Sequence, residues 1–305
     1  MKRRRSLAVF PGVILFSLAA CASAPVVSAP PDTTGQVHFS QIHHLSEIYR
    51  IMRYERDAQI RSAVGREYDE LALVDLPVTE NRYMIGTLNA ERRHEIYIRG
   101  TANMKNVLSD LAYRPHLNEK LGINLHTGFE RMALAVYQDI LPRLNPDYDL
   151  VIFGHSLGAA EAVILAMLLD QDHWKVKQVY ASGQPRVTDV AGEKKFDHLP
   201  ILRVINEDDP VPFLPPRAIV SASSPYTHLG DAVIILDGPY YCLLAEDTCD
   251  EVLASDFWHT LSREGPVAQV EEHFIASYIA RLAPKLPGAV QVPYAERDAY
   301  MTNGK

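Results

Sequence analysis

The residues in this sequence that most clearly indicate chemistry are a serine enclosed between two glycines. Residues 154–158 read Gly-His-Ser-Leu-Gly, a G-x-S-x-G pattern. In such a turn the glycines allow a sharp reversal of the chain, and the strained backbone presents the Ser156 hydroxyl as a nucleophile. Short motifs recur by chance, so the pattern alone is a weak signal and a glycine-rich turn without catalysis is the alternative. The neighbouring elements must therefore support it.

The residues on either side of the pattern are typical of a buried strand and a helix. Residues 149–153 end in four consecutive apolar residues, as expected for a strand that is buried on both faces, and residues 157–169 are typical of a helix. This arrangement would place Ser156 above the carboxyl end of the strand. The backbone N–H of Leu157 would lie at the helix N-terminus, where it can stabilise an oxyanion. The predicted chemistry is nucleophilic catalysis.

Strands alternate with helices along the rest of the chain. Apolar runs and helical periodicity predict strands at 83–88, 95–98, 176–181, 201–206 and 233–236 and helices at 41–64, 129–140 and 268–282. This alternation predicts an α/β fold with a mostly parallel central sheet flanked by helices. We expect one domain at residues 40–287, followed by a polar C-terminal tail at 288–305.

Four further blocks accompany the Ser156 turn. They are Tyr-Ile-Arg-Gly-Thr at 97–101, His-Thr-Gly-Phe at 126–129, Ala-Ser-Gly-Gln-Pro-Arg-Val at 181–187, and Arg-Val-Ile-Asn-Glu-Asp-Asp-Pro-Val-Pro at 203–212. In type and order they resemble motifs of the class 3 lipases, the fungal-lipase-like branch of the α/β-hydrolases. The resemblance covers residues 97–212, with a weaker match to about residue 282. It implies the α/β-hydrolase fold.

The resemblance assigns catalytic roles to individual positions. Ser156 corresponds to the nucleophile, and Thr101 with the N–H of Leu157 corresponds to the oxyanion hole. Asp209 corresponds to the acid of a catalytic triad, which holds the histidine in one tautomer and stabilises its imidazolium. The adjacent Asp208 is the alternative, and Asp209 is preferred because it precedes x-Val-Pro.

The base must be a histidine that follows the acid, because the triad order in this fold is Ser, Asp, His. His273 is preferred, since it opens the last predicted helix in a stretch similar to the family's H-x-x-x-x-Y-[IL] run. His259, in an aromatic stretch, is the second candidate, and His228 resembles a non-catalytic stretch. His126 and His155 are expected to be structural. The implied mechanism needs no metal or cofactor, and no His/Cys cluster has the spacing of metal ligands.

Residues 102–113 resemble the family's lid. They place several apolar side chains on one helical face, and an ordinary packed helix is the alternative interpretation.

The N-terminus has the pattern of an export signal. Four positive charges at residues 2–5 precede an apolar run of 14 residues, too short to cross a bilayer of ~30 Å as a helix. Residues 18–21, Leu-Ala-Ala-Cys, resemble a bacterial lipobox, which implies a signal peptide at 1–20 and lipidation of Cys21. Residues 21–39 are a Pro/Ala-rich tether. Ala22 favours the outer membrane, and an ordinary secreted protein that loses Cys21 is the alternative.

The other two cysteines and the net charge add further expectations. Cys242 and Cys249 are separated by six residues, and in an exported chain such a pair predicts a disulfide, with two free thiols as the alternative. The formal charge of −8 becomes −12 once the four charges of the signal are removed, which argues against a nucleic-acid partner. A hydrophobic content of 47% excludes a disordered chain.

Together these features predict a serine carboxylic-ester hydrolase of lipase type that cleaves acylglycerols or other lipid esters through an acyl-enzyme. A phospholipase A1 or a short-chain esterase is the alternative within enzymes. A catalytically silent envelope lipoprotein that serves as a scaffold is the alternative outside them. The expected partners are a lipid or ester substrate and, through the lipid anchor, a membrane of the bacterial cell envelope.

Overall fold

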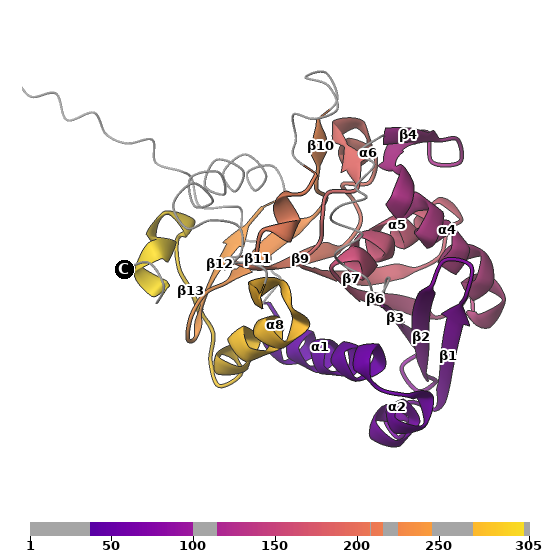
Figure 1. Cartoon of the computed structure of the whole chain (residues 1–305), viewed down its shortest axis with the longest axis horizontal. Helices are drawn as coiled ribbons and strands as arrows, with labels where there is room; N and C mark the ends of the chain where they lie inside the picture. The colour runs from indigo at the N-terminus through magenta and orange to yellow at the C-terminus, as the bar shows by residue number, and fades with distance from the viewer. Residues whose placement is uncertain (1–36, 100–114, 208, 216–224, 246–270, 302–305) are drawn as a thin grey trace, which may run out of the picture. The chain divides into compact units, whose positions relative to one another are not determined.

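A nine-stranded sheet forms the centre of the fold (Figure 1). The structure is a computed structural model that describes residues 37–99, 115–207, 209–215, 225–245 and 271–301, all within one unit. In spatial order the strands are β1 (Glu70–Leu76), β2 (Asn81–Leu88), β3 (Arg93–Ile98), β6 (Asp149–His155), β7 (Val176–Ser182), β9 (Ile201–Asn206), β11 (Asp231–Ile235), β12 (Tyr240–Leu244) and β13 (Val290–Gln291). The five strands from β3 to β11 are parallel. The strand β2 pairs antiparallel with both β1 and β3, and β12 pairs antiparallel with β11.

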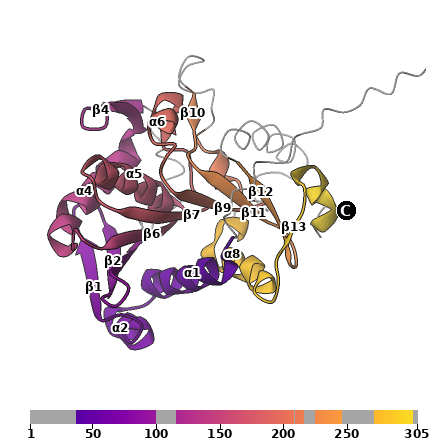
Figure 2. The ribbon, with the colours of Figure 1, turned by 180° about the vertical axis from the view of Figure 1, so that it is seen from behind.

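Helices cover both faces of this sheet (Figures 1 and 2). On one face lie α4 (Thr127–Ile140) and α5 (Leu157–Gln171), which pack against each other. On the other lie α1 (Phe39–Tyr54), α2 (Asp57–Val64) and α8 (Ile275–Leu282), with α1 against α8. A second sheet contains β10 (Tyr226–Thr227), β8 (Thr188–Asp189), β5 (Ile123–His126) and β4 (Pro115–Asn118), beside α6 (Val190–Lys195). Short 3₁₀ turns are η1 (Leu141–Arg143), η2 (Val211–Phe213), η4 (Glu271–His273), η5 (Ala283–Lys285) and η6 (Tyr294–Tyr300).

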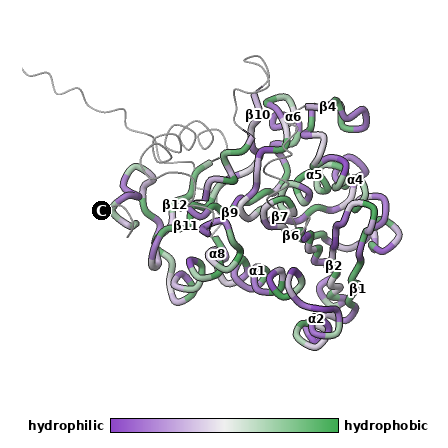
Figure 3. Tube along the Cα trace, viewed as in Figure 1, coloured by the Kyte–Doolittle hydropathy of each residue, from purple (hydrophilic) through white to green (hydrophobic). Residues whose placement is uncertain are grey.

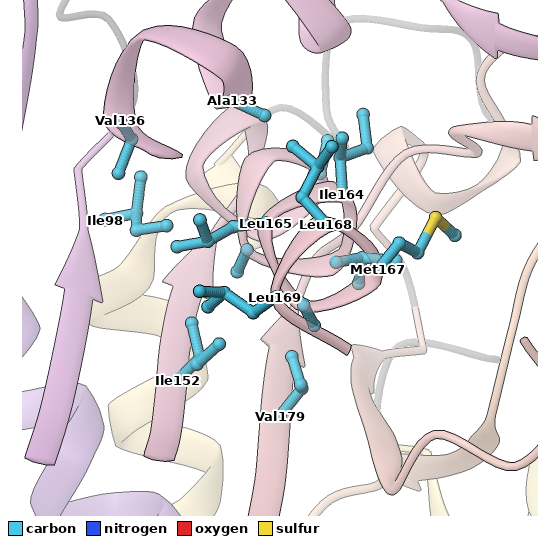
Figure 4. Close-up of a cluster of buried hydrophobic side chains, with 14 of the residues drawn as sticks. Ile98, Ala133, Val136, Ile152, Ile164, Leu165, Met167, Leu168, Leu169 and Val179 are labelled. Atoms are coloured by element: carbon cyan, nitrogen blue, oxygen red, sulfur yellow. The ribbon is translucent and has the colours of Figure 1, made fainter. Parts of the chain in front are cut away.

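The helix α5 lies inside the core. Its residues from Leu157 to Leu169 are all buried, and its sequence is predominantly hydrophobic (Figure 3). Figure 4 shows side chains of α5 among Ile98, Ile152 and Val179 of the parallel strands and residues of α4. A helix that is apolar on all sides must be buried on all sides, so α5 has one stable position over the sheet. Its N-terminus, directly after residue 156, is fixed with it.

The predicted architecture is confirmed: the sheet is mostly parallel at its centre and flanked by helices. Two boundaries differ by more than two residues. The helix predicted at 41–64 is divided at residues 55–56 into α1 and α2, and the last helix begins at Ile275. Among the described residues, no helix is both long enough and apolar enough to cross a membrane.

The C-terminal residues differ more from the prediction of a polar tail at 288–305. Residues 290–291 form β13, which pairs in parallel with β12, and Val292 is buried. The ring of Tyr300 lies 4.3 Å from that of Tyr240, measured between centroids. In residues 290–301, apolar residues alternate irregularly with polar and charged ones and pack at the edge of the sheet. The segment is too short to show helical or strand periodicity. The folded domain therefore continues past residue 287 and includes described residues as far as 301.

Several predicted features lie outside the described residues. These are the signal peptide, the tether as far as residue 36 with Cys21, the lid at 102–113, and Thr101, Asp208, Cys249 and His259. The last residue of the predicted tether, Phe39, is instead buried and begins α1.

One carboxyl group is enclosed in the apolar core of α5. Glu161 is fully buried, and the side-chain amide of Asn81 donates a hydrogen bond to its Oε2. Burial raises the pKa of the Glu161 carboxyl from 4.5 to about 8, because the charged form loses its hydration. Glu161 is therefore neutral in the folded protein at neutral pH.

This buried acid should make stability depend on pH. Between pH 4.5 and 8 the folded state keeps the Glu161 proton and the unfolded chain has lost it, so stability falls as pH rises through that window. Glu161→Gln removes this dependence, at most about 1.4 kcal/mol per pH unit. Urea denaturation at several pH values checks it, with exposed Glu119→Gln as the control. An unchanged slope in Glu161→Gln would assign the dependence to other groups.

Candidate active site

The turn between β6 and α5 holds Ser156 in a backbone conformation that side chains rarely adopt. Its φ is 59° and its ψ is −129°. A Cβ at Gly154 would lie 2.2 Å from the carbonyl oxygen of Gly158, and one at Gly158 would lie 2.1 Å from that of Ile98. Only glycine fits at either position. The strain at Ser156 persists because β6 and α5 on both sides are fixed by burial and hydrogen bonds.

Two hydrogen bonds connect Ser156 to a histidine and a carboxylate that are distant in sequence. The hydroxyl Oγ of Ser156 lies 2.7 Å from Nε2 of His273. The other ring nitrogen of His273, Nδ1, lies 2.7 Å from Oδ2 of Asp209. Asp209 follows β9, and His273 ends η4 just before α8. The structure thus brings the three residues together at the carboxyl end of the parallel strands.

The chemistry of the partners determines where the protons lie. An ionised carboxylate only accepts hydrogen bonds, so Nδ1 of His273 carries a hydrogen and donates it to Asp209. In the neutral ring Nε2 is then an acceptor, and the Ser156 hydroxyl donates to it. This tautomer can take the serine proton while Asp209 stabilises the resulting imidazolium.

The carboxylate of Asp209 is held by two further donors. The backbone N–H of Val211 donates to Oδ1 at 2.9 Å, and the hydroxyl of Tyr278 on α8 donates to Oδ2 at 2.5 Å. Asp209 is completely buried. Burial, followed by the neighbouring Asp209, raises the pKa of Tyr278 well above 10, so its hydroxyl keeps the proton that it donates. A Cβ at Gly183 would lie 3.0 Å from both oxygen atoms of this Tyr278–Asp209 contact, which explains the glycine there.

The residue before His273 is tied to the strand that precedes the acid. The side-chain amide of Asn206, the last residue of β9, donates to the backbone oxygen and to a carboxylate oxygen of Glu272, both at 2.8 Å. These bonds fix η4 against the end of β9. The loop of the acid and the loop of the base are thus connected independently of the Asp209–His273 bond.

The remaining predicted residues have the following positions. Leu157 is the first residue of α5. The backbone N–H groups in the first turn of a helix have no carbonyl partner within the helix, and that of Leu157 is one of them. His228 is buried and donates from Nε2 to the oxygen of Pro212 at 2.7 Å. Cys242 on β12 is buried and forms no disulfide with a described residue. Because Cys249 lies outside the described residues, the disulfide between the two stays a prediction. Burial lowers the pKa of His126 to about 4, and its ring stacks on Phe129.

Sequence reasoning missed the supporting residues Tyr278, Asn206 and Gly183. All three lie in the motif-like blocks at residues 181–187, 203–212 and 273–279, so their positions carried a signal. Their roles did not, because each contacts a residue far away in the chain. Within the described ranges, no group of three or more His, Cys, Asp or Glu residues is arranged to hold a metal ion.

Comparison with known proteins finds similarity to lipases. Residues 95–219 match the model of the lipase (class 3) family. The matched segment includes Ser156 and Asp209, and His273 lies beyond it. The chain is 28% identical over 173 residues to a lipase of Rhizomucor miehei, covering 52% of this chain and 46% of the relative. It is 31% identical over 150 residues to the secreted mono- and diacylglycerol lipase A of Penicillium cyclopium, covering 46% and 49%.

The match to curated relatives is partial, and the structural match is broader. The chain spans about half the length of these two relatives. The crystal structure of a lipase from Rhizopus microsporus var. chinensis superposes with a TM-score of 0.58 at 21% identity, covering 73% of this chain and 87% of that chain. This likeness shows the fold, which is the α/β-hydrolase fold.

The hydrogen bond from Tyr278 to Asp209 predicts a measurable effect on the serine. Tyr278→Phe removes one donor from a buried carboxylate and should slow the labelling of Ser156 by a fluorophosphonate about tenfold, since hydrogen bonds to charged groups are worth roughly 1.5–3 kcal/mol. Tyr241→Phe is the matched control, because Tyr241 makes an exposed hydrogen bond on β12. Equal labelling rates in both variants would contradict a role for the Tyr278 hydroxyl.

Proposed function

We propose that this chain is a serine carboxylic-ester hydrolase of lipase type, which cleaves acylglycerols or other lipid esters through an acyl-enzyme at Ser156. The observation that carries the proposal is the pair of 2.7 Å contacts that link Ser156, His273 and the buried Asp209. A scaffold protein has no need of a strained serine connected to a histidine and a carboxylate. The strain at Ser156 is therefore evidence for catalysis rather than for structure alone.

In the proposed mechanism His273 acts first as a base and then as an acid. Its Nε2 takes the hydroxyl proton as Oγ of Ser156 attacks the ester carbonyl, and Asp209 stabilises the imidazolium. The backbone N–H of Leu157, at the positive end of α5, and Thr101 stabilise the oxyanion. His273 then returns the proton to the leaving alcohol, and water, activated by the same Nε2, hydrolyses the acyl-enzyme.

The substrate class is supported by the relatives. The similar proteins carry names such as lipase and secreted mono- and diacylglycerol lipase. These names favour acylglycerols over other esters for this chain. Phospholipase A1 activity and short-chain esterase activity use the same three residues, so the geometry at Ser156 does not separate them.

Hydrolysis of a defined set of esters tests the function. The wild type should hydrolyse p-nitrophenyl esters and mono- and diacylglycerols, and Ser156→Ala should lower kcat by at least about 10⁴-fold. Ser46→Ala is the matched control, since Ser46 is a buried serine on α1 whose hydroxyl bonds the oxygen of Ile42. Hydrolysis only of short p-nitrophenyl esters would indicate an esterase, and preference for phosphatidylcholine a phospholipase A1. No turnover and no fluorophosphonate labelling of Ser156 would reject the enzyme.

We also propose that the chain is exported and tied to the bacterial cell envelope, at the outer membrane, by lipid on Cys21. Support comes from the lipobox-like sequence at residues 18–21 and from relatives described as secreted.

Labelling with palmitate tests the anchor. The wild type should incorporate the label and sediment with outer membranes, and Cys21→Ala should do neither. Cys242→Ala, which changes a buried thiol in the domain, should keep the label. Label retained in Cys21→Ala would contradict the anchor without affecting the proposal for Ser156.

A further inference from the structure

The histidine directly before the nucleophile contacts the base of the triad. His155 ends β6, and its ring is buried beneath the site. Its Nε2 lies 2.8 Å from the backbone oxygen of His273, and its Nδ1 lies 3.2 Å from Oγ of Ser182. The contact joins residues that are 118 positions apart in the chain. His155, the neighbour of Ser156 in the chain, is therefore hydrogen-bonded to the backbone of His273, whose ring contacts Ser156.

The partners of the ring define its protonation. A carbonyl oxygen only accepts, so Nε2 of His155 carries a hydrogen and donates it to His273. Burial, then the neighbouring His273 and Arg53, lower the pKa of His155 well below 6.5, so the ring stays neutral. Nδ1 is then an acceptor, and the Ser182 hydroxyl donates to it. A neutral ring adds no positive charge beside His273 when that residue takes a proton.

Aromatic rings enclose His155 on several sides. Its ring is stacked on that of His273, with centroids 5.0 Å apart and an angle of 28° between the planes. The rings of Tyr278 and Tyr49 meet it edge to face, at 5.1 and 5.9 Å. Tyr49 on α1 also donates a hydrogen bond to the oxygen of Arg99, at the end of β3. The orientation of His155 is thus fixed by groups from β7, α1 and α8.

We propose that His155 is a positioning residue that holds His273 at hydrogen-bonding distance from Ser156, by donating from Nε2 to the His273 backbone oxygen and stacking on its ring. The inference rests on the proposed function of Ser156. Because His155 and Ser156 are adjacent in one rigid turn, any shift of the turn moves the nucleophile and the support of its base together. A displacement of about 1 Å between Ser156 and His273 would lower the rate on the order of 10²-fold.

Two variants that differ by one methylene group separate the donor from the rest of the side chain. In His155→Gln the amide nitrogen is as many bonds from Cα as Nε2 of histidine, so it can still donate to His273. In His155→Asn the amide nitrogen is one bond shorter and cannot reach. His94→Asn is the matched control, because His94 is also buried and its Nε2 accepts a hydrogen bond from the backbone N–H of Asn145. His94 lies on β3 opposite Leu150, at the far end of β6 from Ser156.

The variants are measured in the whole chain by ester hydrolysis and by proton NMR of His273 Nδ1–H, whose downfield resonance reports its bond to Asp209. We expect His155→Asn to lower kcat about 10- to 100-fold, to leave KM within about twofold, and to shift or broaden the resonance. His155→Gln should recover most of kcat and the wild-type resonance. His94→Asn should lower the denaturation midpoint and leave kcat and the resonance unchanged.

Each other outcome rejects a defined statement. Equal kcat and equal resonances in His155→Asn and His155→Gln overturn the positioning role, as does a loss of kcat in His94→Asn of the same size. A wild type that hydrolyses no ester rejects the proposed function. Even in that case, a resonance that is disturbed in His155→Asn but not in His155→Gln would support the positioning role of His155. If His155→Asn does not fold, the test relies on His155→Gln alone. A kcat and a resonance in His155→Gln that both differ from those of the wild type would then overturn the positioning role.

Discussion

The strained backbone of Ser156 is the constraint on which the rest of the site depends. A non-glycine residue at a φ of 59° costs on the order of 1–3 kcal/mol, and it persists only where its surroundings determine it. Here they do so from both sides. The strand β6 lies between two parallel neighbours, and α5 is buried along its length. The burial of the mostly hydrophobic helix α5 thus fixes the position of the Ser156 hydroxyl.

The acid and the base reach that hydroxyl by connected routes. Asp209 follows β9, two strands away from β6, and Asn206 at the end of β9 bonds the residue before His273. Tyr278, one turn into α8, returns to bond Asp209. Each of the two loops is therefore bonded to the other at more than one point. Three residues supported in this way are preorganised, so the proposed reaction needs little of a substrate's binding energy to align them.

Sequence patterns predict local features well and distant contacts poorly, and this site contains both. The turn at Ser156 was predictable because its glycines and the flanking strand and helix are contiguous. His273 could be preferred over His259 only by resemblance, since no spacing relates it to Ser156. The bonds of Tyr278 and His155 depend on how α8 and η4 lie against residues at the ends of β9 and β6, which no local pattern encodes. For β13 the reason is different: two residues on a sheet edge are too few to show a period.

The folding of the C-terminus onto the sheet determines where a shortened protein could end. Arg297 in η6 forms a 2.6 Å ion pair with Glu207, which follows Asn206 and lies two residues before Asp209. Lys285, just after α8, donates to the backbone oxygens of Leu236 and Gly238 on the hairpin that β13 extends. A chain cut at residue 287 would keep all three members of the triad and lose one support of the acid's loop. The folded domain thus continues past His273 and includes residues that contact the loop of Asp209.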